Sequence, residues 1–545
     1  MKSLSLLALT LSAVVLLPGC PNTGIVCAAD TIRCGQGCVD SNNDAKNCGT
    51  CGSACRSGQV CQAASCRCSA GTDVCDGECV VLASDPKNCG ACGVTSANAR
   101  CGTGQVCEAG ACRASCLSAA SPTNCSGACV NTASDPNHCG ACGVVCGNAL
   151  SCHLGQCTYD LVAACFSSGQ VVGLQQKSEF RGPAEPLGSG PQSLAALEGR
   201  LLSLDGIDQR LYQAQLKSVA GHAFARLANP NTTGNAPNQV ITEGQFAYVA
   251  NSGTGSVQVL RNYGASYPDG GAAADGGIAL VTVAELSLGT NTYPQGIVKV
   301  GTALWVPLYG GFGAAGAVAG QSVVRIDVAN PAAPVKTDTL SLTGLDLKPF
   351  DGGTPVPRPY AILAHRGAVY VALNNLNPDT YAPEGPGLLA KINTTTKAIS
   401  VIDLGADKCL NPGWLASDGT RLLVSCIGAA VYSGPPSFAL VRTDRSGIML
   451  LDETDVVRAS WTPSCPSAVD GGSGCTPILP SRFAISGGRA YVGDQNGGRI
   501  FVLDINGNTL GERRGYFGDA GAAISACAPD AITGIANVSD VLALP

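Results

Sequence analysis

Cysteine is the residue type whose number and spacing in this chain point most directly to chemistry. Of the 31 cysteines, 25 lie between Cys27 and Cys165, and 24 of these form three sets of eight. Spacings of three, nine, two, five and four residues recur in every set around a CGxCG core, whereas the first and fifth spacings vary. The cores contain Cys48 and Cys51, Cys89 and Cys92, and Cys139 and Cys142. Cysteines two residues apart can hold zinc as thiolates or can form disulfides.

The context favours disulfides over metal. The cysteines come in eights rather than fours, and only His138 and His153 lie near them. A module of about 40 residues has too little core to fold alone, so cross-links must replace burial. We therefore predict three disulfide-rich repeats, at residues 27–66, 68–112 and 116–157, with no bound metal. The spacing does not give the connectivity within each repeat.

The clearest signatures of the repeats are DPKNCGACG at residues 85–93 and DPNHCGACG at residues 135–143. This pattern resembles the plant stigma-specific protein family, whose Cys-rich modules also occur in bacterial surface proteins. The resemblance covers residues 27–157 and depends mainly on Cys, Gly and Asn positions. It implies a secreted module stapled by disulfides and no known chemistry.

The N-terminus has the form of an export signal. Lys2 is followed by an apolar stretch at residues 4–17 that is too short to span a bilayer, and then by LPGC at residues 17–20. LPGC resembles a bacterial lipobox, although Pro18 is less usual at its position. The resemblance implies a signal peptide at residues 1–19, lipidation of Cys20 and an anchor linker at residues 20–26. We expect a membrane-anchored protein of the bacterial cell envelope, periplasmic or surface-facing; the alternative is an ordinary secretory signal cut elsewhere.

The elements that position the rest of the chain are short strands that recur from residue 160 onward. PSRFAISGGRAYV at residues 480–492 shows the pattern of a Pro-led strand, a Gly turn and a second strand. Similar copies start at Pro191, Pro237, Pro294, Pro359, Pro412, Pro480 and Pro529. An outer-strand motif such as RIFVLD at residues 499–504 follows six of them, and its seventh copy, GQVVGLQQ at residues 169–176, precedes the first.

A blade divided between the two chain ends is how a propeller closes its ring without an exposed sheet edge. Repeats of about 40–50 residues are also typical of propellers. We therefore predict an all-β fold, with the three disulfide-rich repeats followed by a seven-bladed β-propeller at residues 160–545. Six or eight blades, an open solenoid and tandem sandwiches are the alternatives.

Two of the repeats, YVANSGTGSVQVL at residues 248–260 and YVGDQNGGRIFVLD at residues 491–504, look like the YVTN-type repeats of surface and periplasmic propellers. Related propellers include gluconolactonases, which implies a metal-dependent, lactonase-like hydrolase as the enzyme alternative. Such a site needs carboxylates and amides that meet in the channel around a metal. Asp494, Asn496, Asn374 and Asn251 are candidates, but all four occupy typical turn positions.

No other catalytic pattern stands out in this domain. It has no Gly-x-Ser-x-Gly elbow, and its two histidines, His222 and His365, lie far apart in the sequence. A lone histidine in a β-domain is more often structural than a base. We therefore expect no catalysis and no cofactor.

Long insertions are predicted to share one face of the propeller. Those at residues 308–321, 374–386 and 427–445 lie between second and third strands, and those at 343–358 and 461–479 precede first strands. Because neighbouring strands alternate in direction, all five fall on the same side, here named the long-loop face. The remaining cysteines fall there too, and we predict the pairs Cys409–Cys426, Cys465–Cys475 and Cys165–Cys527.

Charge excludes one class of partner. The net charge is −6 and no basic run is present, so nucleic acid is not expected to bind. Long loops on a rigid scaffold usually carry recognition. We expect a lipid-anchored binding, adhesion or scaffolding protein with a protein or glycan ligand at the long-loop face. The alternatives are the lactonase-like hydrolase and a purely structural envelope protein.

Overall fold

The computed structural model describes residues 32–544 except 35–36, 43, 57–58, 63, 69–71, 93–99, 119–120, 147–149, 154, 177–180, 217–223, 228–229, 265–277, 433–439, 463–477, 514–526 and 528–536. The predictions for Cys20, Cys465, Cys475 and His222 lie outside the described residues. The chain forms two compact units, Met1–Thr132 and Ala133–Pro545.

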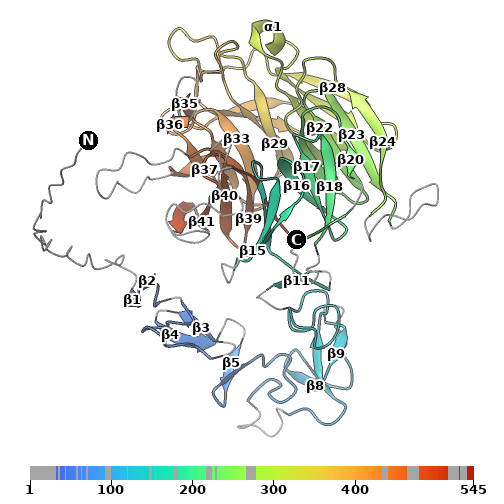
Figure 1. Ribbon diagram of the computed structural model, residues 1–545, viewed down its shortest axis with the longest axis vertical. Helices are drawn as coiled ribbons and strands as arrows, with labels where there is room; N and C mark the ends of the chain where they lie inside the picture. The colour runs from blue at the N-terminus through green and yellow to red at the C-terminus, as the bar shows by residue number, and fades with distance from the viewer. Residues whose placement is uncertain are drawn as a thin grey trace, which may run out of the picture. The chain divides into compact units, whose positions relative to one another are not determined.

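Short hairpins make up the described part of the first unit (Figure 1), and disulfides cross-link them. The hairpins are β1 (Ile32–Cys34) with β2 (Gly37–Val39), β3 (Gln59–Gln62) with β4 (Ser65–Cys68), and β5 (Asp73–Cys75) with β6 (Glu78–Val80). A small sheet has the order β8 (Ala111–Arg113), β7 (Val106–Glu108), β10 (Ala128–Val130), β9 (Thr123–Cys125). Strands of three or four residues cannot bury enough apolar surface to be stable by themselves. Covalent cross-links therefore carry much of the stability.

The second repeat shows the full cross-linking pattern. Its bonds are Cys68–Cys79, Cys75–Cys92, Cys89–Cys107 and Cys101–Cys112. In repeat order, these pair the first cysteine with the third, the second with the fifth, the fourth with the seventh and the sixth with the eighth. The bonds described in the first repeat, Cys34–Cys51, Cys48–Cys61 and Cys55–Cys66, follow the same order. The prediction of disulfide-rich repeats is confirmed.

The backbone conformation requires the first glycine of the CGxCG core. Gly90 has a φ of +76°, a region that favours glycine, and a Cβ there would collide with the carbonyl oxygen of Gly110. Gly49 has the same φ and a Cβ there would meet the carbonyl oxygen of Ala64. The core motif thus encodes a tight backbone approach as well as two disulfides.

Seven antiparallel sheets, six with four strands and one with five, make up most of the second unit. From the inner strand outward, the first sheet consists of β16 (Pro191–Leu197), β17 (Arg200–Asp205), β18 (Arg210–Gln215) and β19 (Ala225–Arg226), and β20 (Asn231–Thr232) also pairs with β18. The second consists of β21 (Pro237–Glu243), β22 (Phe246–Asn251), β23 (Ser256–Asn262) and β24 (Leu280–Ser287). The third consists of β25 (Val298–Val300), β26 (Ala303–Leu308), β27 (Ser322–Asp327) and β28 (Val335–Ser341). The next three are β29 (Pro359–His365), β30 (Ala368–Leu373), β31 (Leu388–Asn393) and β32 (Ile399–Asp403); β33 (Pro412–Ser417), β34 (Leu422–Cys426), β37 (Gly447–Leu451) and β38 (Val457–Trp461); and β39 (Pro480–Ser486), β40 (Arg489–Asp494), β41 (Ile500–Asn506) and β42 (Thr509–Arg513). The six predicted Pro-led pairs from Pro191 to Pro480, each with its following strand, thus form most of six blades, whereas Pro529 of the seventh copy lies outside the described residues.

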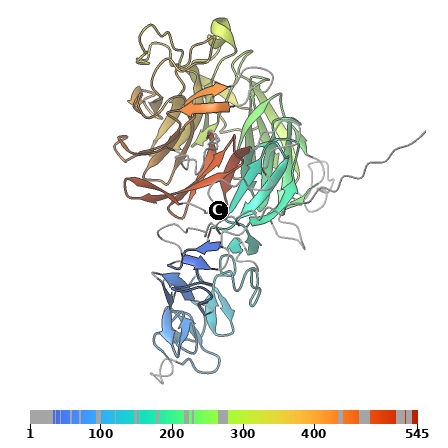
Figure 2. The same cartoon turned by 60° about the vertical axis from the view of Figure 1, so that its left-hand side comes forward.

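The seventh sheet closes the ring. It combines the C-terminal strand β43 (Val538–Ala543), as its inner strand, with β13 (Leu161–Cys165), β14 (Gln170–Leu174) and β15 (Arg181–Pro186). β43 pairs antiparallel with β13. Figure 2 shows the red C-terminal blade beside the teal strands that begin the propeller. The predicted seven-bladed propeller is confirmed, and the outer-strand motif occupies the third of four positions, with a further strand outside it.

Burial explains why the second and third strands of the blades are short apolar runs. All six residues of β26, ALWVPL, and all five of β37, GIMLL, are buried because neighbouring blades cover both faces. The outermost strand β28, VKTDTLS, is mostly exposed and mostly polar. The core therefore lies between blades, in the second and third strands.

Part of the third repeat belongs to this second unit. Its hairpin of β11 (Ser151–His153) and β12 (Gln156–Thr158) precedes the first propeller strand directly. Leu150, Cys152 and Tyr159 share one apolar cluster with Leu187 and Phe224 of the propeller. The bonds Cys139–Cys152 and Cys146–Cys157 fix this segment.

Helix is rare in the part of the chain that is described. The single α-helix there is α1 (Gly313–Ala317), in the insertion between β26 and β27 (Figure 1). Among these residues, no helix has the length and apolar character needed to cross a membrane.

Candidate ligand site at the channel and the long-loop face

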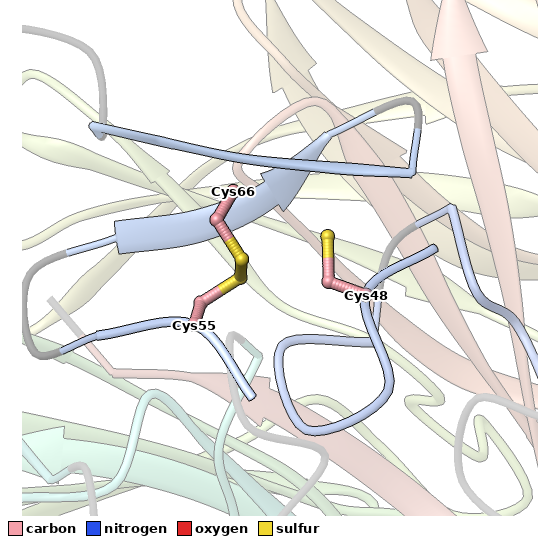
Figure 3. A group of neighbouring side chains, drawn as sticks. All are labelled: Cys48, Cys55 and Cys66. Carbon is pink, nitrogen blue, oxygen red and sulfur yellow. A yellow bond between two sulfur atoms is a disulfide. The ribbon is translucent and has the colours of Figure 1, made fainter. Parts of the chain in front are cut away.

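The sulfur clusters of the repeats are disulfides rather than metal ligands. Cys48, Cys55 and Cys66 bring their sulfur atoms within 4.8 Å of one another, as zinc ligands would. Figure 3 shows, however, that Cys55 and Cys66 share an S–S bond. Cys48 is bonded to Cys61. Because zinc binds thiolates, these oxidised sulfurs cannot hold it.

Asp494, the first candidate metal ligand, is a structural residue. Its carboxylate is buried and accepts hydrogen bonds from the backbone N–H of Leu479 at 3.2 Å and of Asn496 at 3.0 Å. Arg499 lies 2.8 Å from its other oxygen, while burial raises the pKa of this carboxyl. Asp205 fills the same place in another blade and accepts from Ser189 and Gly190. The carboxylate at this position therefore ties a second strand to the loop before the first strand.

The other candidates are also placed within blades. Asn251 donates to Ser256, and Asn374 donates to Asn411. The four candidates therefore do not form one site: Asn496 contacts Asp494, whereas Asn251 and Asn374 have other partners. None of the four lines either channel cavity described below. His365 contacts Ser417, with 2.8 Å between Nδ1 and Oγ, and burial lowers the pKa of its imidazole.

The channel is lined by the innermost strands. A register shift follows the leading proline in five of them, and such bulges re-aim the side chains that follow. Two places after the proline stand Ser193, Gln239, Ala361, Trp414 and Arg482, which all line a cavity of about 480 Å³. Asp540 of β43 lines the same cavity.

Arg482 and Trp414 divide the channel. Both also line a second cavity, of about 190 Å³, so they lie at the boundary between the two. The guanidinium stacks 4.1 Å from the centre of the indole ring. It donates to the carbonyl oxygens of Gln192 at 3.0 Å and Asn238 at 2.8 Å. Burial lowers the pKa of Arg482, although hydrogen bonds and cation–π contact hold the charge in place.

Asp540 supplies the negative charge that faces Arg482. Its Oδ2 accepts from the backbone N–H of Leu194 at 2.8 Å, and burial raises its pKa to about 6 against the attraction of Arg482. It is the one carboxylate among the described residues that line these two cavities. Calcium takes about six to eight oxygen ligands, often several of them carboxylates. The described lining therefore does not form the metal site that a lactonase-like hydrolase would need.

The burial of Asp540 has a measurable pH consequence. A carboxyl whose pKa rises from 3.8 to about 6 on folding stabilises the fold fully at low pH, and this contribution is lost as pH rises through about 6. Two pKa units correspond to about 3 kcal/mol. We expect the stability of the wild type relative to Asp540→Asn to fall by about that amount between pH 4 and pH 7.5, as measured by urea unfolding. The charged and titratable groups nearby, Arg482 and Tyr360, are the same in both proteins, so the difference in stability reports the titration of Asp540. A difference that stays flat or grows with pH would contradict this assignment.

On the long-loop face, Arg358 holds two insertions together. Its side chain is fully buried, and Nη1 donates to the carbonyl oxygens of Gly310 at 2.9 Å and Gly311 at 2.6 Å. Nη2 donates to the carbonyl oxygen of Pro378 at 3.3 Å. One guanidinium thus bridges the β26–β27 insertion and the β30–β31 insertion.

The β28–β29 segment joins the same cluster through Glu384. The carbonyl oxygen of Glu384 accepts from Phe350 at 2.7 Å, and its carboxylate accepts from the N–H of Thr354 at 2.9 Å. Val356 and Leu376 form an isolated β-bridge. Three of the predicted long loops therefore form one hydrogen-bonded platform, here named the Arg358 platform.

Aromatic rings run from the channel to the tip of the Arg358 platform. Successive ring centres lie 4.9–6.0 Å apart from Trp414 to Tyr360 to Tyr309, and from Tyr381 to Phe312 to Tyr293. Arg358 joins the two halves because its guanidinium lies 5.1 Å from the Tyr309 ring and 4.9 Å from the Tyr381 ring. Phe312, just before α1, is 75% exposed. The outer half of this aromatic row therefore includes a large apolar side chain, that of Phe312, that is held in water.

Sequence reasoning missed Arg358, Arg482 and Phe312. Arg358 immediately precedes a leading proline, and its φ of +43° resembles that of Ala236 and Asn411, which precede other leading prolines. The backbone conformation therefore belongs to the repeat, whereas the long charged side chain is particular to this blade. A comparison of the Pro-led copies position by position would have singled out both arginines.

The structure also places the remaining predicted cysteines. Cys409 is bonded to Cys426, and Cys165 is bonded to Cys527, across a sequence separation of 362 residues. All four are buried. The second bond links the end of β13 to the segment that precedes β43, at the point where the ring closes.

Comparison with known proteins finds likeness in both parts of the chain. The family model described as "Stigma-specific STIG1-like protein family" matches residues 108–160, which supports the resemblance for the third repeat. No curated protein matches the chain significantly.

Among solved structures, a 6-phosphogluconolactonase candidate from Bacteroides fragilis is 12% identical, with a TM-score of 0.45 over 71% of this chain and 97% of that one. A similar candidate from Bacteroides uniformis is 15% identical, with a TM-score of 0.42 over 65% and 94%. Apo AztD from Citrobacter koseri is 14% identical, with a TM-score of 0.39 over 64% and 93%. The chain is thus similar to stigma-specific proteins over residues 108–160, while its propeller is defined by its own strand pairing.

Proposed function

We propose that the protein is an exported binding protein that holds a protein or glycan partner at the long-loop face of its propeller. The aromatic row on the Arg358 platform carries this proposal. Aromatic side chains bury large areas with few rotatable bonds, and exposed ones are enriched at binding sites. A 75% exposed phenylalanine on a hydrogen-bonded loop has a clear use as an anchor for a partner.

Pre-organisation strengthens this argument. Binding costs free energy when loops and side chains must first become ordered. Here the carbonyl groups of Gly310, Gly311 and Pro378 are already fixed by one buried guanidinium. A partner would therefore meet a surface that needs little further ordering.

Catalysis is not part of the proposal. The lactonase-like alternative needs a cluster of carboxylates, and Asp540 alone supplies one to the described channel lining. Hydrolysis of a lactone by the purified protein, abolished by a chelator, would favour that alternative. The purely structural alternative would be favoured by a failure to bind any envelope component.

The remaining parts of the chain complete the proposal. Lipidation of Cys20 would anchor the protein to a membrane of the bacterial envelope, since acyl chains hold a protein without a spanning helix. The disulfide-rich repeats would act as a stalk that resists proteolysis. Mass spectrometry of the mature N-terminus distinguishes an acylated Cys20 from an ordinary signal cleavage.

The role of the aromatic row can be tested with one substitution. Phe312→Ala removes the exposed ring and is expected to weaken capture of the partner from envelope or glycan fractions by about 30-fold, the effect of losing an anchor worth about 2 kcal/mol. Retention of the partner on immobilised protein at graded concentrations measures the change. Because the ring is largely in water, the thermal midpoint should be unchanged.

Val318→Ala is the matched control. Val318 is equally exposed, at 75%, and lies just after α1, but it makes no ring contact in the aromatic row. It should retain wild-type binding. Equal retention by Phe312→Ala and the wild type would refute the assignment of this surface, whatever the partner is.

A further inference from the structure

Residues that line the smaller channel cavity carry buried polar atoms that have no partner. It measures about 190 Å³ and is lined by Phe166, Gln192, Tyr360, Trp414, Arg482, Gln495, Asn537 and Ser539. Three of these residues contribute a buried side-chain atom without a hydrogen bond: Nε of Arg482, Nε1 of Trp414 and Oδ1 of Asn537. Trp414 is 8% exposed and Arg482 is 7% exposed. A buried polar group without a partner costs about 1–3 kcal/mol, so three around one cavity call for an occupant.

Topology places this cavity at the channel mouth on the long-loop face. Gln192 and Tyr360 each follow the leading proline of a first strand, β16 and β29. Phe166 and Gln495 directly follow the second strands β13 and β40. These positions all lie where first strands begin and second strands end. The cavity therefore lies at the channel end of the row of rings that leads from Trp414 through Tyr360 to the Arg358 platform.

We propose that this cavity binds one neutral sugar unit, either a free monosaccharide or the terminal residue of a glycan held along the aromatic row. The inference deepens the proposed function and rests on it. It assigns a ligand class and names Trp414, Arg482 and Asn537 as the groups that recognise the ligand.

The three unpartnered atoms define the chemistry of the ligand. Arg482 and Trp414 offer N–H donors, whereas the Asn537 oxygen accepts. A sugar hydroxyl both donates and accepts, so neighbouring hydroxyls of one ring can satisfy both kinds of group. A simple carboxylate would satisfy the two donors and leave the Asn537 oxygen without a hydrogen. The rings of Phe166, Tyr360 and Trp414 supply flat apolar faces for the C–H side of a sugar ring.

Charge and size narrow the class further. Arg482 interacts electrostatically with Asp540, so the described lining of the two cavities already contains one negative charge for its one buried cation. An anionic ligand would add a second negative charge beside Asp540, which disfavours sugar acids. A volume of about 190 Å³ equals the liquid volume of about six water molecules and is smaller than drug-sized pockets. It suits one ring rather than a chain of them.

Tryptophan fluorescence gives a direct test on the full chain. The protein has three tryptophans, Trp305, Trp414 and Trp461, so a change on ligand binding can be assigned by substitution. Glucose, galactose, mannose and N-acetylglucosamine are titrated to millimolar concentration, with glucuronate as the anionic comparison. We expect at least one neutral sugar to change the emission saturably, and glucuronate to bind at least tenfold more weakly.

Matched variants locate the site. Trp414→Phe keeps an aromatic face but removes the N–H donor, and it should abolish the fluorescence change and weaken binding about tenfold by calorimetry. Trp305→Phe is the control, because Trp305 also has a buried Nε1 without a partner but lies in a blade core away from the channel. It should leave both readouts intact. Asn537→Ala, which should also weaken binding about tenfold, serves if Trp414→Phe does not fold.

The outcomes separate the inference from the proposed function. If no neutral sugar binds, the inference is wrong and water is the occupant of the cavity. If glucuronate binds as tightly as the neutral sugars, the inference is also wrong. Partner capture that persists and still depends on Phe312 would leave the proposed function standing. Loss of sugar binding in Trp305→Phe would also overturn the assignment of the site.

Discussion

Replacing Cys165 and Cys527 together by alanine is expected to lower the free energy of unfolding of the propeller by about 5–6 kcal/mol. The bond closes a loop of 362 residues, and in the chain-entropy model the stabilisation grows with the logarithm of loop length. Without it, the ring is closed by noncovalent contacts, chiefly the pairing of β43 with β13 and the hydrogen bonds between β43 and β16. Denaturant unfolding under non-reducing conditions, followed by the fluorescence of the propeller tryptophans, measures the loss.

Cys409→Ala with Cys426→Ala is the control pair. These cysteines are equally buried, but their bond spans only 17 residues, for which the same model gives about 3 kcal/mol. The closing bond should therefore cost about twice as much to remove. Equal losses for the two pairs would mean that the closing bond does not restrain the unfolded chain as its loop length implies.

Arg358→Met is expected to destabilise the propeller by about 3–5 kcal/mol and to loosen the long-loop face. Methionine has similar length but no donors, so the carbonyl oxygens of Gly310 and Gly311 are left buried without their charged partner. The cation–π contacts with Tyr309 and Tyr381 are lost as well. Denaturant unfolding measures the stability, and limited proteolysis within residues 308–321 and 374–386 measures the loosening.

Arg325→Met provides the comparison. Arg325 lies on β27 of a neighbouring blade and contacts Asp338 at 3.6 Å, but both side chains are partly in water. Exposed pairs contribute about 0–1 kcal/mol, so this variant should be nearly as stable as the wild type. Arg358→Met with wild-type stability and protease resistance would show that the platform is held by its other hydrogen bonds. Partner binding in Arg358→Met should fall together with loop order.

The fold could be predicted from the sequence because each blade repeats the same local instructions. The leading proline, the Gly turn and the run of buried residues in β39 and β40 recur at intervals of 46–68 residues, and the displaced copy at β14 revealed the closure. The cysteine spacing likewise identified the disulfide-rich repeats. Their connectivity did not follow, because pairing depends on which hairpins the CGxCG turns bring together in space.

The site was harder to predict because its residues interrupt the repeat. Asp494 fits both a metal ligand and a turn residue in the sequence, and Asp205 shows that a carboxylate at this position stabilises a loop. Arg482 has no counterpart in the other inner strands. The bulge that turns its side chain into the channel cannot be predicted from any single residue. Stacking between residues far apart in the sequence, such as that of Arg482 on Trp414, depends on how neighbouring blades pack.

The overlapping disulfides of the repeats also limit how far that segment can be stretched. If fully extended, the 32 residue steps from Cys34 to Cys66 would span about 110 Å. The bonds Cys34–Cys51 and Cys55–Cys66, each with Cα atoms 5.4 Å apart, leave only the four steps between Cys51 and Cys55 in the covalent path, about 25 Å in all. A pull on the chain is therefore borne by covalent bonds after little extension, and this part of the protein behaves as a short, nearly inextensible tether.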